Sequence, residues 1–321
     1  MEHFGTTTKG KDVHRLTISA GDLSVKILTL GAAVQDVRLA GVDHSLTLGS
    51  ETLADYETGM GYFGTIVGPI ANRISHGRLR IKGMMYELER NEKGRTHLHS
   101  GSEGVHARVW RVTDHTPDSV TLTLDLPDGA AGLPGNRTIT ATYRVTAPAT
   151  LTLEMTGTTD AATCMNFAQH GYWNLDGTPT WEGHALRIAA DHYLPVDENL
   201  YPTGEVEEVA GTGLDFRDAR KPAPNHPSLD HNFCLSDEKE PLRDVVWLTG
   251  ASGLSMTVAT TEPGVQIHDA SAANRPGQAR FEGIVIEAQG WPDAPNNRHF
   301  PSIMVTPDAP YTQTTSWRFS R

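Results

Sequence analysis

Two ionisable side chains, far apart in the chain, have the chemistry of a proton-transfer pair. His170 lies in NFAQHGYWNL, among amide and apolar residues and shortly before two aromatic rings, and Glu287 follows the apolar run GIVI at 283–286. A carboxyl group at the end of an apolar strand is partly desolvated, which raises its pKa towards neutral, and an imidazole titrates near neutral pH. The two groups can therefore act as general base and general acid at one pH. The structural alternatives are a hydrogen-bonded core histidine and a solvated glutamate at a strand exit.

Three further polar residues interrupt segments that otherwise look like strands. Arg73 follows an asparagine in GPIANRISHG; read alone it is a surface arginine at a strand start, whereas a buried arginine needs a partner or a ligand. His97 and His99 in GRTHLHSGSEG share a face if the segment is extended. An HxH pair invites a metal site, but a clear third ligand is missing, so we interpret the segment as a polar hydrogen-bonding loop and expect no metal.

The elements that must position these residues are strands. In SVTLTLDLP (119–127) and ATLTLEMTGT (149–158), apolar residues alternate with polar ones, which predicts a sheet with one buried face. Helical periodicity is confined to ETLADYETG (51–59), enough for a turn or two, and turn-forming Pro, Gly and Asn recur throughout. We therefore predict an all-β fold, a single large antiparallel β-sandwich domain over residues 1–321 with little helix.

Composition and charge limit the classes of function. Of 321 residues, 38% are hydrophobic and 21% charged, and the net charge of -12 argues against a general affinity for nucleic acid or an anionic membrane. Cys164 and Cys234 have no metal-binding spacing, as expected of thiols in an intracellular protein. The stretch MEHFGTTTKGKDVHRL lacks the apolar core of a signal peptide, and no apolar run is long enough to cross a bilayer, so we expect a cytoplasmic protein.

Eight motifs occur in the order in which one known family has them. They are NRI at 72–74, LHSG at 98–101, HGYWNL at 170–175, LPVDENLYPTGE at 194–205, DFR at 215–217, LDHNF at 229–233, TTEPGVQI at 260–267 and IEAQGWPDAPN at 286–296. Through these motifs nearly the whole chain resembles the aldose 1-epimerases, also called galactose mutarotases. The patterns HxYxNL and ExQxxPDAPN are the most specific of the set.

The resemblance implies a galactose mutarotase-like supersandwich with the sugar in an open cleft on one sheet. It gives His170 the role of general acid and Glu287 that of general base. Asp230, in LDHNF, matches a carboxylate that binds sugar hydroxyls, and Arg73 and His99 match two further polar contacts. The implied reaction interconverts the α and β anomers of a free aldose such as galactose or glucose. It needs no cofactor, and the expected assembly is a monomer or weak homodimer.

This chain departs from the family pattern at several positions beside the implied cleft. Pro69 stands where the family usually has an arginine, and Ser100 where it has a second glycine. After TTEPGVQI the family tends to have an aromatic residue and a threonine-glycine-asparagine turn, whereas this chain has His268, Asp269 and Ala270. These departures leave the acid and base in place, and we expect them to affect sugar specificity.

Three alternatives remain open from the sequence. One is a non-catalytic sugar-binding protein on the same fold, and another is a metal-dependent enzyme built on His97 and His99. The third is a hexose-phosphate mutarotase, for which Arg73, Arg78 and the nearby Arg80 and Lys82 would have to supply cationic charge at the cleft.

Overall fold

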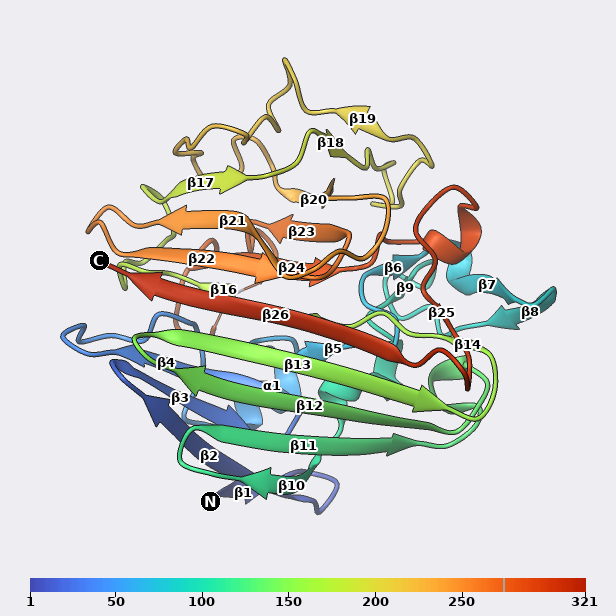
Figure 1. Ribbon diagram of the computed structural model, residues 1–321, viewed down its shortest axis with the longest axis horizontal. Helices are drawn as coiled ribbons and strands as arrows, with labels where there is room; N and C mark the ends of the chain where they lie inside the picture. Colours follow the sequence, from blue (N-terminus) through green and yellow to red (C-terminus); the bar gives the residue numbers. More distant parts are fainter. Residues whose placement is uncertain (274) are drawn as a thin grey trace.

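Strands dominate the computed structural model, which describes residues 1–273 and 275–321 (Figure 1). Neighbouring strands in the large sheets pair antiparallel, so the predicted all-β antiparallel sandwich is confirmed. Within the described residues there is one α-helix, α1 (Leu53–Thr58), in the segment for which the sequence predicts a turn or two of helix. None of the described helices is long and apolar enough to cross a membrane.

The largest sheet has eight strands. From one edge to the other they are β10 (Arg111–His115), β11 (Ser119–Leu126), β12 (Arg137–Thr146), β13 (Thr150–Thr159), β26 (Tyr311–Ser320), β22 (Ser255–Thr260), β21 (Arg243–Thr249) and β17 (Ala185–Ile188). The predicted alternation holds along β13, where Leu151, Leu153 and Met155 are buried and Glu154 is exposed. Figure 1 shows β26, in red, inserted between β13 and β22, so the end of the chain joins two strand groups into one sheet.

A six-stranded sheet and a four-stranded sheet complete the large layers. The six strands are, in order, β16 (Tyr172–Trp173), β24 (Ile284–Gln289), β23 (Gly264–His268), β20 (Asp230–Cys234), β18 (His192–Tyr193) and β19 (Glu207–Glu208). The four strands are β1 (Glu2–Thr6), β2 (Asp12–Ala20), β3 (Leu23–Leu28) and β4 (Ala33–Leu39). Strand β24 is buried along its whole length, which indicates that both of its faces are covered.

Short ladders and turns connect these sheets. The ladders pair β5 (Ile66–Val67) with β15 (Ala168–Gln169), β6 (Arg73–Ile74) with β9 (His97–Leu98), β7 (Arg78–Ile81) with β8 (Met84–Glu87), and β14 (Thr163–Cys164) with β25 (Met304–Val305). Single 3₁₀ turns cover Ser75–Gly77, Gly101–Glu103, Val105–Ala107, Ala130–Gly132 and Ala294–Asn296. The β5–β15 and β6–β9 ladders bring the segments that contain His170, Arg73 and His99 to one side of the six-stranded sheet.

One hydrophobic cluster joins all three large sheets. It includes Val25 on β3, Leu151 on β13, and Ile267 and Ile286 on β23 and β24, each at most 1% exposed. Fully burying such a side chain stabilises the fold by about 1.5–3 kcal/mol. The core therefore fixes one face of the six-stranded sheet firmly, and the polar residues that alternate with Ile267 and Ile286 occupy the opposite face.

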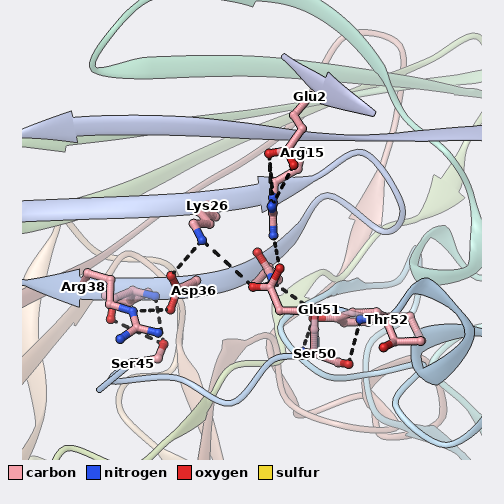
Figure 2. A network of polar contacts seen from close by, with 12 residues as sticks. Glu2, Arg15, Lys26, Asp36, Arg38, Ser45, Ser50, Glu51 and Thr52 are labelled. Carbon is pink, nitrogen blue, oxygen red and sulfur yellow. Dashed lines mark hydrogen bonds and ion pairs between the residues drawn. The ribbon is translucent and has the colours of Figure 1, made fainter. Parts of the chain in front are cut away.

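A network of ion pairs ties the four-stranded sheet to the segment that precedes α1 (Figure 2). Glu51 accepts a hydrogen bond from Arg15 on β2 and lies 4.0 Å from Lys26 Nζ on β3, and Lys26 also lies 3.5 Å from Asp36 on β4. The chain then runs through α1 into residues 59–63, several of which line the cavity described below. The network thus anchors the start of a segment that forms part of the cavity wall.

Candidate active site

The face of the six-stranded sheet opposite the core forms the floor of a polar cavity. Glu287 on β24 pairs with Gln266 on β23, and His268 on β23 pairs with Asp230 on β20. Side chains that are directly paired, or two residues apart on one strand, point to the same face of a sheet. These four residues therefore lie together, while Ile267, between Gln266 and His268, points into the core. The strand register alone assembles this floor from three separate segments of sequence.

His170 lies beside Glu287 at the edge of the floor. Its Nε2 atom is 3.6 Å from Glu287 Oε1, and the two side chains are only 5% and 3% exposed. The His170 backbone is fixed by two hydrogen bonds, from its N–H to the Thr65 carbonyl and from the Gly64 N–H to its own carbonyl. The sequence-predicted pair thus meets in one cavity. The two groups stand side by side.

Burial pushes both members of this pair towards their uncharged forms. It lowers the pKa of His170 to about 3, helped by the imidazole of His268, and raises the pKa of Glu287 to about 8, helped by the carboxylate of Asp230. The shift of Glu287 has the direction that the sequence predicts, whereas the expectation that the imidazole titrates near neutral pH is wrong for His170, because the ring is buried. His170 Nδ1 and Glu287 Oε2 find no hydrogen-bond partner among the described residues. At neutral pH Glu287 is therefore protonated and the His170 ring is neutral, so the pair has one proton that can move between the two groups. Strong perturbation of this kind is typical of functional sites.

Arg73 and Asp230 form a second charged group in the cavity. Arg73 donates through Nε and Nη2 to the two carboxylate oxygens of Glu92, at 2.9 and 3.0 Å, and through Nη1 to Asp230 Oδ2 at 3.3 Å. Asp230 Oδ1 accepts a hydrogen bond of 2.6 Å from Gln266. Burial opposes both charges, but the pairing outweighs it, raising the pKa of Arg73 and lowering that of Asp230. Arg73 is 7% exposed, so its interpretation as a surface arginine is wrong.

His99 presents a hydrogen-bond donor to the cavity. The backbone N–H of Asn72 donates to His99 Nδ1 at 3.0 Å, so the neutral ring carries its proton on Nε2. Burial, with the neighbouring His170, keeps the pKa of His99 well below its ordinary value. Ligand atoms of His99, His170 and Glu287 lie within 4.8 Å of one another, a spacing that could hold a metal ion. A ligating histidine, however, usually donates its other N–H, whereas His99 accepts there, so this donor set fits a metal ion poorly.

His97, the other half of the HxH pair, lies outside the cavity lining. Its Nδ1 contacts the Glu89 carbonyl at 2.7 Å, and its side chain is buried elsewhere, with the residue only 1% exposed. The expectation that His97 and His99 share a face assumes an extended segment. The φ of His99 is 50°, in the left-handed region, which turns the chain at this point. The two side chains therefore do not share a face, and the alternative of a metal site built on His97 and His99 lacks its geometric basis.

Aromatic rings complete the cavity wall. The Tyr62 ring stacks on the imidazole of His170, with centroids 5.6 Å apart at 23°, and Phe63 stacks on Tyr172 at 3.9 Å and 6°. The enclosed volume is about 260 Å³. The remaining lining residues are Gly59, Asn72, Leu98, Ala272 and Ala273. A small cavity with a polar floor and aromatic walls suits a sugar, whose C–H faces contact rings while its hydroxyls form hydrogen bonds.

Sequence reasoning identified five residues of this cavity and missed other lining residues, and it also missed Gln266, which lies behind the lining and donates to Asp230. Gln266 lies in the motif TTEPGVQI, and the alternation along that strand places it on the same face as His268. That signal could have found it. Glu92 and Tyr62 lie outside the strands, where no periodicity marks their direction. Only the folded chain shows that Glu92 pairs with Arg73 and that Tyr62 covers His170.

Known proteins resemble this chain along almost its whole length. The family model described as aldose 1-epimerase matches residues 14–318. Galactose mutarotases from Rattus norvegicus and Homo sapiens are each 33% identical to it, over 97% of this chain and 95% of theirs. An aldose 1-epimerase from Escherichia coli (strain K12) is 29% identical, over 92% of this chain and 91% of its own.

Solved structures agree with the sequence comparisons. The GalM/aldose epimerase homologue from C. elegans superposes with a TM-score of 0.89 at 26% identity, over 96% of this chain and 99% of that chain. Galactose 1-epimerase from Lactobacillus acidophilus NCFM gives a TM-score of 0.85 at 27% identity, over 98% and 97%. The fold, the order of the motifs and the full-length family match lead to one conclusion: this chain belongs to the aldose 1-epimerase family.

Proposed function

We propose that this protein interconverts the α and β anomers of a free aldose, such as galactose or glucose, by acid–base ring opening and closure. The observation that carries the proposal is the 3.6 Å contact between His170 Nε2 and Glu287 Oε1 in a cavity of sugar size. We assign Glu287 the role of base and His170 the role of acid. The names of the relatives, galactose mutarotase and aldose 1-epimerase, support the same reaction.

The proposed reaction moves two protons around one carbon atom. Glu287 removes the proton of the anomeric hydroxyl, and the electrons of that O–H bond form the carbonyl double bond at C1. The bond from C1 to the ring oxygen breaks, and the ring oxygen keeps its electron pair and takes a proton from His170. After rotation about C1–C2, the same oxygen attacks the other face of the aldehyde, and both proton transfers reverse. Each transfer by a positioned group is worth roughly a hundredfold or more in rate.

The side-by-side geometry of the pair suits this chemistry. The anomeric oxygen and the ring oxygen are bonded to the same carbon, so an acid and a base 3.6 Å apart can reach both without a large movement of the sugar. Proximity therefore favours the anomeric centre as the reacting position.

The proton count of the pair supports the assigned roles. The neutral pair and the ion pair contain the same number of protons. They differ only in the position of one proton, which is on Glu287 in the neutral pair and on His170 in the ion pair. Burial by itself keeps this proton on Glu287. A bound sugar donates its anomeric O–H to the carboxylate, which favours the ionised form of Glu287 and leaves the proton on His170. Substrate binding thus prepares the form that the reaction uses.

The remaining polar residues supply binding rather than proton transfer in this proposal. Asp230, kept ionised by Arg73, accepts hydrogen bonds from sugar hydroxyls. His99 donates from Nε2, because its Nδ1 is occupied by the Asn72 N–H. Tyr62 holds the imidazole of His170 by stacking and covers a C–H face of the sugar. These contacts position C1 over the pair.

The charges around the cavity do not favour a hexose phosphate. Among the described residues its lining contains the carboxylates of Glu92 and Asp230, the protonated carboxyl group of Glu287 and the guanidinium of Arg73. Arg73 already pairs with both of these carboxylates. Arg78, which could have added charge, lies on β7, pairs with a carboxylate on β8 and is absent from the lining. A phosphate dianion would meet net negative charge, which costs binding free energy.

Exchange between anomers measured by NMR, with and without protein, tests the proposal directly. Galactose, glucose, xylose and arabinose form a small panel that also identifies the preferred aldose. We expect catalysed exchange that is largely lost in His170→Asn and Glu287→Gln. In Glu287→Gln we expect sugar affinity to be mostly retained, because the amide can still form a hydrogen bond with the anomeric hydroxyl.

Three results would count against the proposal. Exchange no faster than the spontaneous rate for every sugar, together with measurable sugar binding, would make the protein a sugar-binding protein. Near-normal turnover in His170→Asn would remove His170 from the acid role. Loss of affinity without loss of turnover in Glu287→Gln would make Glu287 a binding residue.

A further inference from the structure

His268 lies on the cavity floor and takes no part in the proton transfers described above. It is on β23, directly opposite Asp230 on β20, and both residues line the cavity. The Cβ atoms of directly opposite residues in an antiparallel pair are about 4.5–5.5 Å apart. His268 is half-buried. One ligand atom can therefore contact the imidazole and the carboxylate together.

The folded backbone fixes which nitrogen of His268 can donate. The backbone N–H of Ala270 donates to His268 Nδ1 at 2.6 Å, so the neutral ring carries its proton on Nε2. The φ of Ala270 is 56°, so the chain makes a left-handed turn shortly after His268. The turn itself is held by Asp269, whose carboxylate accepts the N–H groups of Ser271 at 3.0 Å and Leu229 at 3.3 Å. The His268 donor is therefore pre-oriented before any ligand arrives.

We propose that His268 Nε2–H and the carboxylate of Asp230 together bind one sugar hydroxyl, on a carbon other than C1, and so determine which aldoses the enzyme prefers. This inference rests on the proposed function. A hydroxyl both donates and accepts, so one placed between a fixed donor and an ionised acceptor satisfies both groups. Glu287, assigned to the anomeric hydroxyl, pairs with Gln266, two residues before His268 on β23. This offset places the His268–Asp230 pair away from C1.

The His268–Asp230 pair creates selectivity because a sugar that lacks the bound hydroxyl loses hydrogen bonds to both side chains. Asp230 is ionised and largely buried and already accepts from Arg73 and Gln266. A sugar without a hydroxyl at this position therefore leaves the fixed donor of His268 unpaired and the buried carboxylate with one hydrogen bond fewer. A site built around a hydroxyl rejects analogues that lack it far more strongly than an apolar pocket rejects an extra group. Because His268 is one of the positions at which this chain departs from the family pattern, we expect a sugar preference that differs from that of its relatives.

A scan of deoxy sugars against two His268 variants tests the inference. We would measure kcat and KM for galactose, glucose and their 2-, 3-, 4- and 6-deoxy derivatives with the wild-type enzyme, His268→Phe and His268→Gln. Phe keeps a ring but removes the donor, and Gln keeps a donor. We expect His268→Phe to lose about tenfold or more in kcat/KM for the preferred sugar, mainly through KM. The loss should vanish for the one deoxy sugar that lacks the bound hydroxyl, and Gln should restore part of it.

His192→Phe is the matched control, because His192 is exposed on β18 and lies outside the cavity. It should leave every constant unchanged. The inference is overturned if His268→Phe changes KM less than twofold for all sugars, or loses the same factor with every deoxy sugar. If the wild-type enzyme fails to accelerate exchange, the proposed function is what fails. Dissociation constants of the same sugars, from NMR titration of the same variants, then decide the inference separately, and thermal unfolding checks that each variant is folded.

Discussion

The pKa of a glutamate is shifted in opposite directions beside the four-stranded sheet and in the cavity. In the network of Figure 2, Glu51 is mostly exposed, and a hydrogen bond from Arg15 lowers its pKa despite partial burial. In the cavity Glu287 is 2% exposed, its ionisable neighbour at 3.6 Å is the neutral imidazole of His170, and burial raises its pKa to about 8. One site holds the carboxylate in its ionised form and the other holds it protonated.

The difference shows how the fold separates stability from chemistry. Each exposed ion pair in the network favours the folded state slightly, by about 0.2–1 kcal/mol. The cavity pair instead makes the folded state less stable. In the folded protein the proton must stay on Glu287, whereas in the unfolded chain this carboxyl group ionises freely. That cost is typical of active sites, where reactivity opposes stability. Four experiments test this contrast, from the largest expected effect to the smallest.

The largest effect should come from removing the proton-transfer groups together. His170→Asn and Glu287→Gln should each lower kcat by roughly 100- to 10,000-fold. The double variant should be little slower than the slower single variant, because groups that act as one unit lose their function together. NMR exchange between anomers measures all three rates. Multiplicative losses would mean that the two groups act independently.

The pH dependence of kcat/KM should show a fall above about pH 8. Below that pH the pair keeps its single proton; above it Glu287 loses that proton while His170 stays neutral, so no acid remains. On the acid side, activity should persist far below pH 6, because the pair gains a second proton only near the His170 pKa of about 3. Polarimetry with the spontaneous rate subtracted measures the profile. A fall that survives unchanged in Glu287→Gln would assign it to another group.

The stability of Glu287→Gln should exceed that of the wild-type protein near neutral pH, by about 1–3 kcal/mol. The sign follows from the raised pKa. Between the ordinary value of 4.5 and about 8, the unfolded chain releases the Glu287 proton while the folded chain keeps it, which favours unfolding. Below 4.5 both states are protonated and the difference should disappear. Urea unfolding at neutral pH and below pH 4.5 measures this difference in the free energy of unfolding. Glu208→Gln, an exposed change on β19, is the control and should show neither effect.

The smallest effect should come from Glu51→Gln in the network. We expect destabilisation of at most about 1 kcal/mol, weaker at high salt, because exposed pairs are screened. The depressed pKa of Glu51 gives a stabilisation that is present above its ordinary value of 4.5 and is lost as the pH falls below it. The pH trend is therefore the reverse of that for Glu287→Gln. Anomer exchange should be unchanged, and a loss of rate would mean that the network acts on the cavity.

Much of the fold follows from local patterns. The alternation in residues 119–127 and 149–158 predicts β11 and β13, and the single stretch with helical spacing contains α1. Side-chain alternation is a property of each strand by itself, so sequence reasoning recovers it. The order of strands in the sheets is different. That β26 inserts between β13 and β22 depends on contacts between distant segments, which no local pattern records.

The candidate site was predicted in part, for a related reason. His170, Glu287, Arg73, His99 and Asp230 were identified through the family resemblance, and all five line one cavity. Their individual surroundings were not predictable from the residues alone. Arg73 looks like a surface residue in sequence but is buried because Glu92 and Asp230 neutralise it. The face that His99 presents depends on a left-handed backbone turn, which the pattern HxH does not reveal.

The sequence by itself determined the chemical groups, the strands that bear them and the family to which they belong. Only the tertiary structure decided the 3.6 Å contact of His170 with Glu287, the opposite pKa shifts of the two, and the pairing of His268 with Asp230. The physical reason is that residue type and alternation are local properties of the chain. Desolvation and cross-strand contact arise when distant segments exclude water from one another.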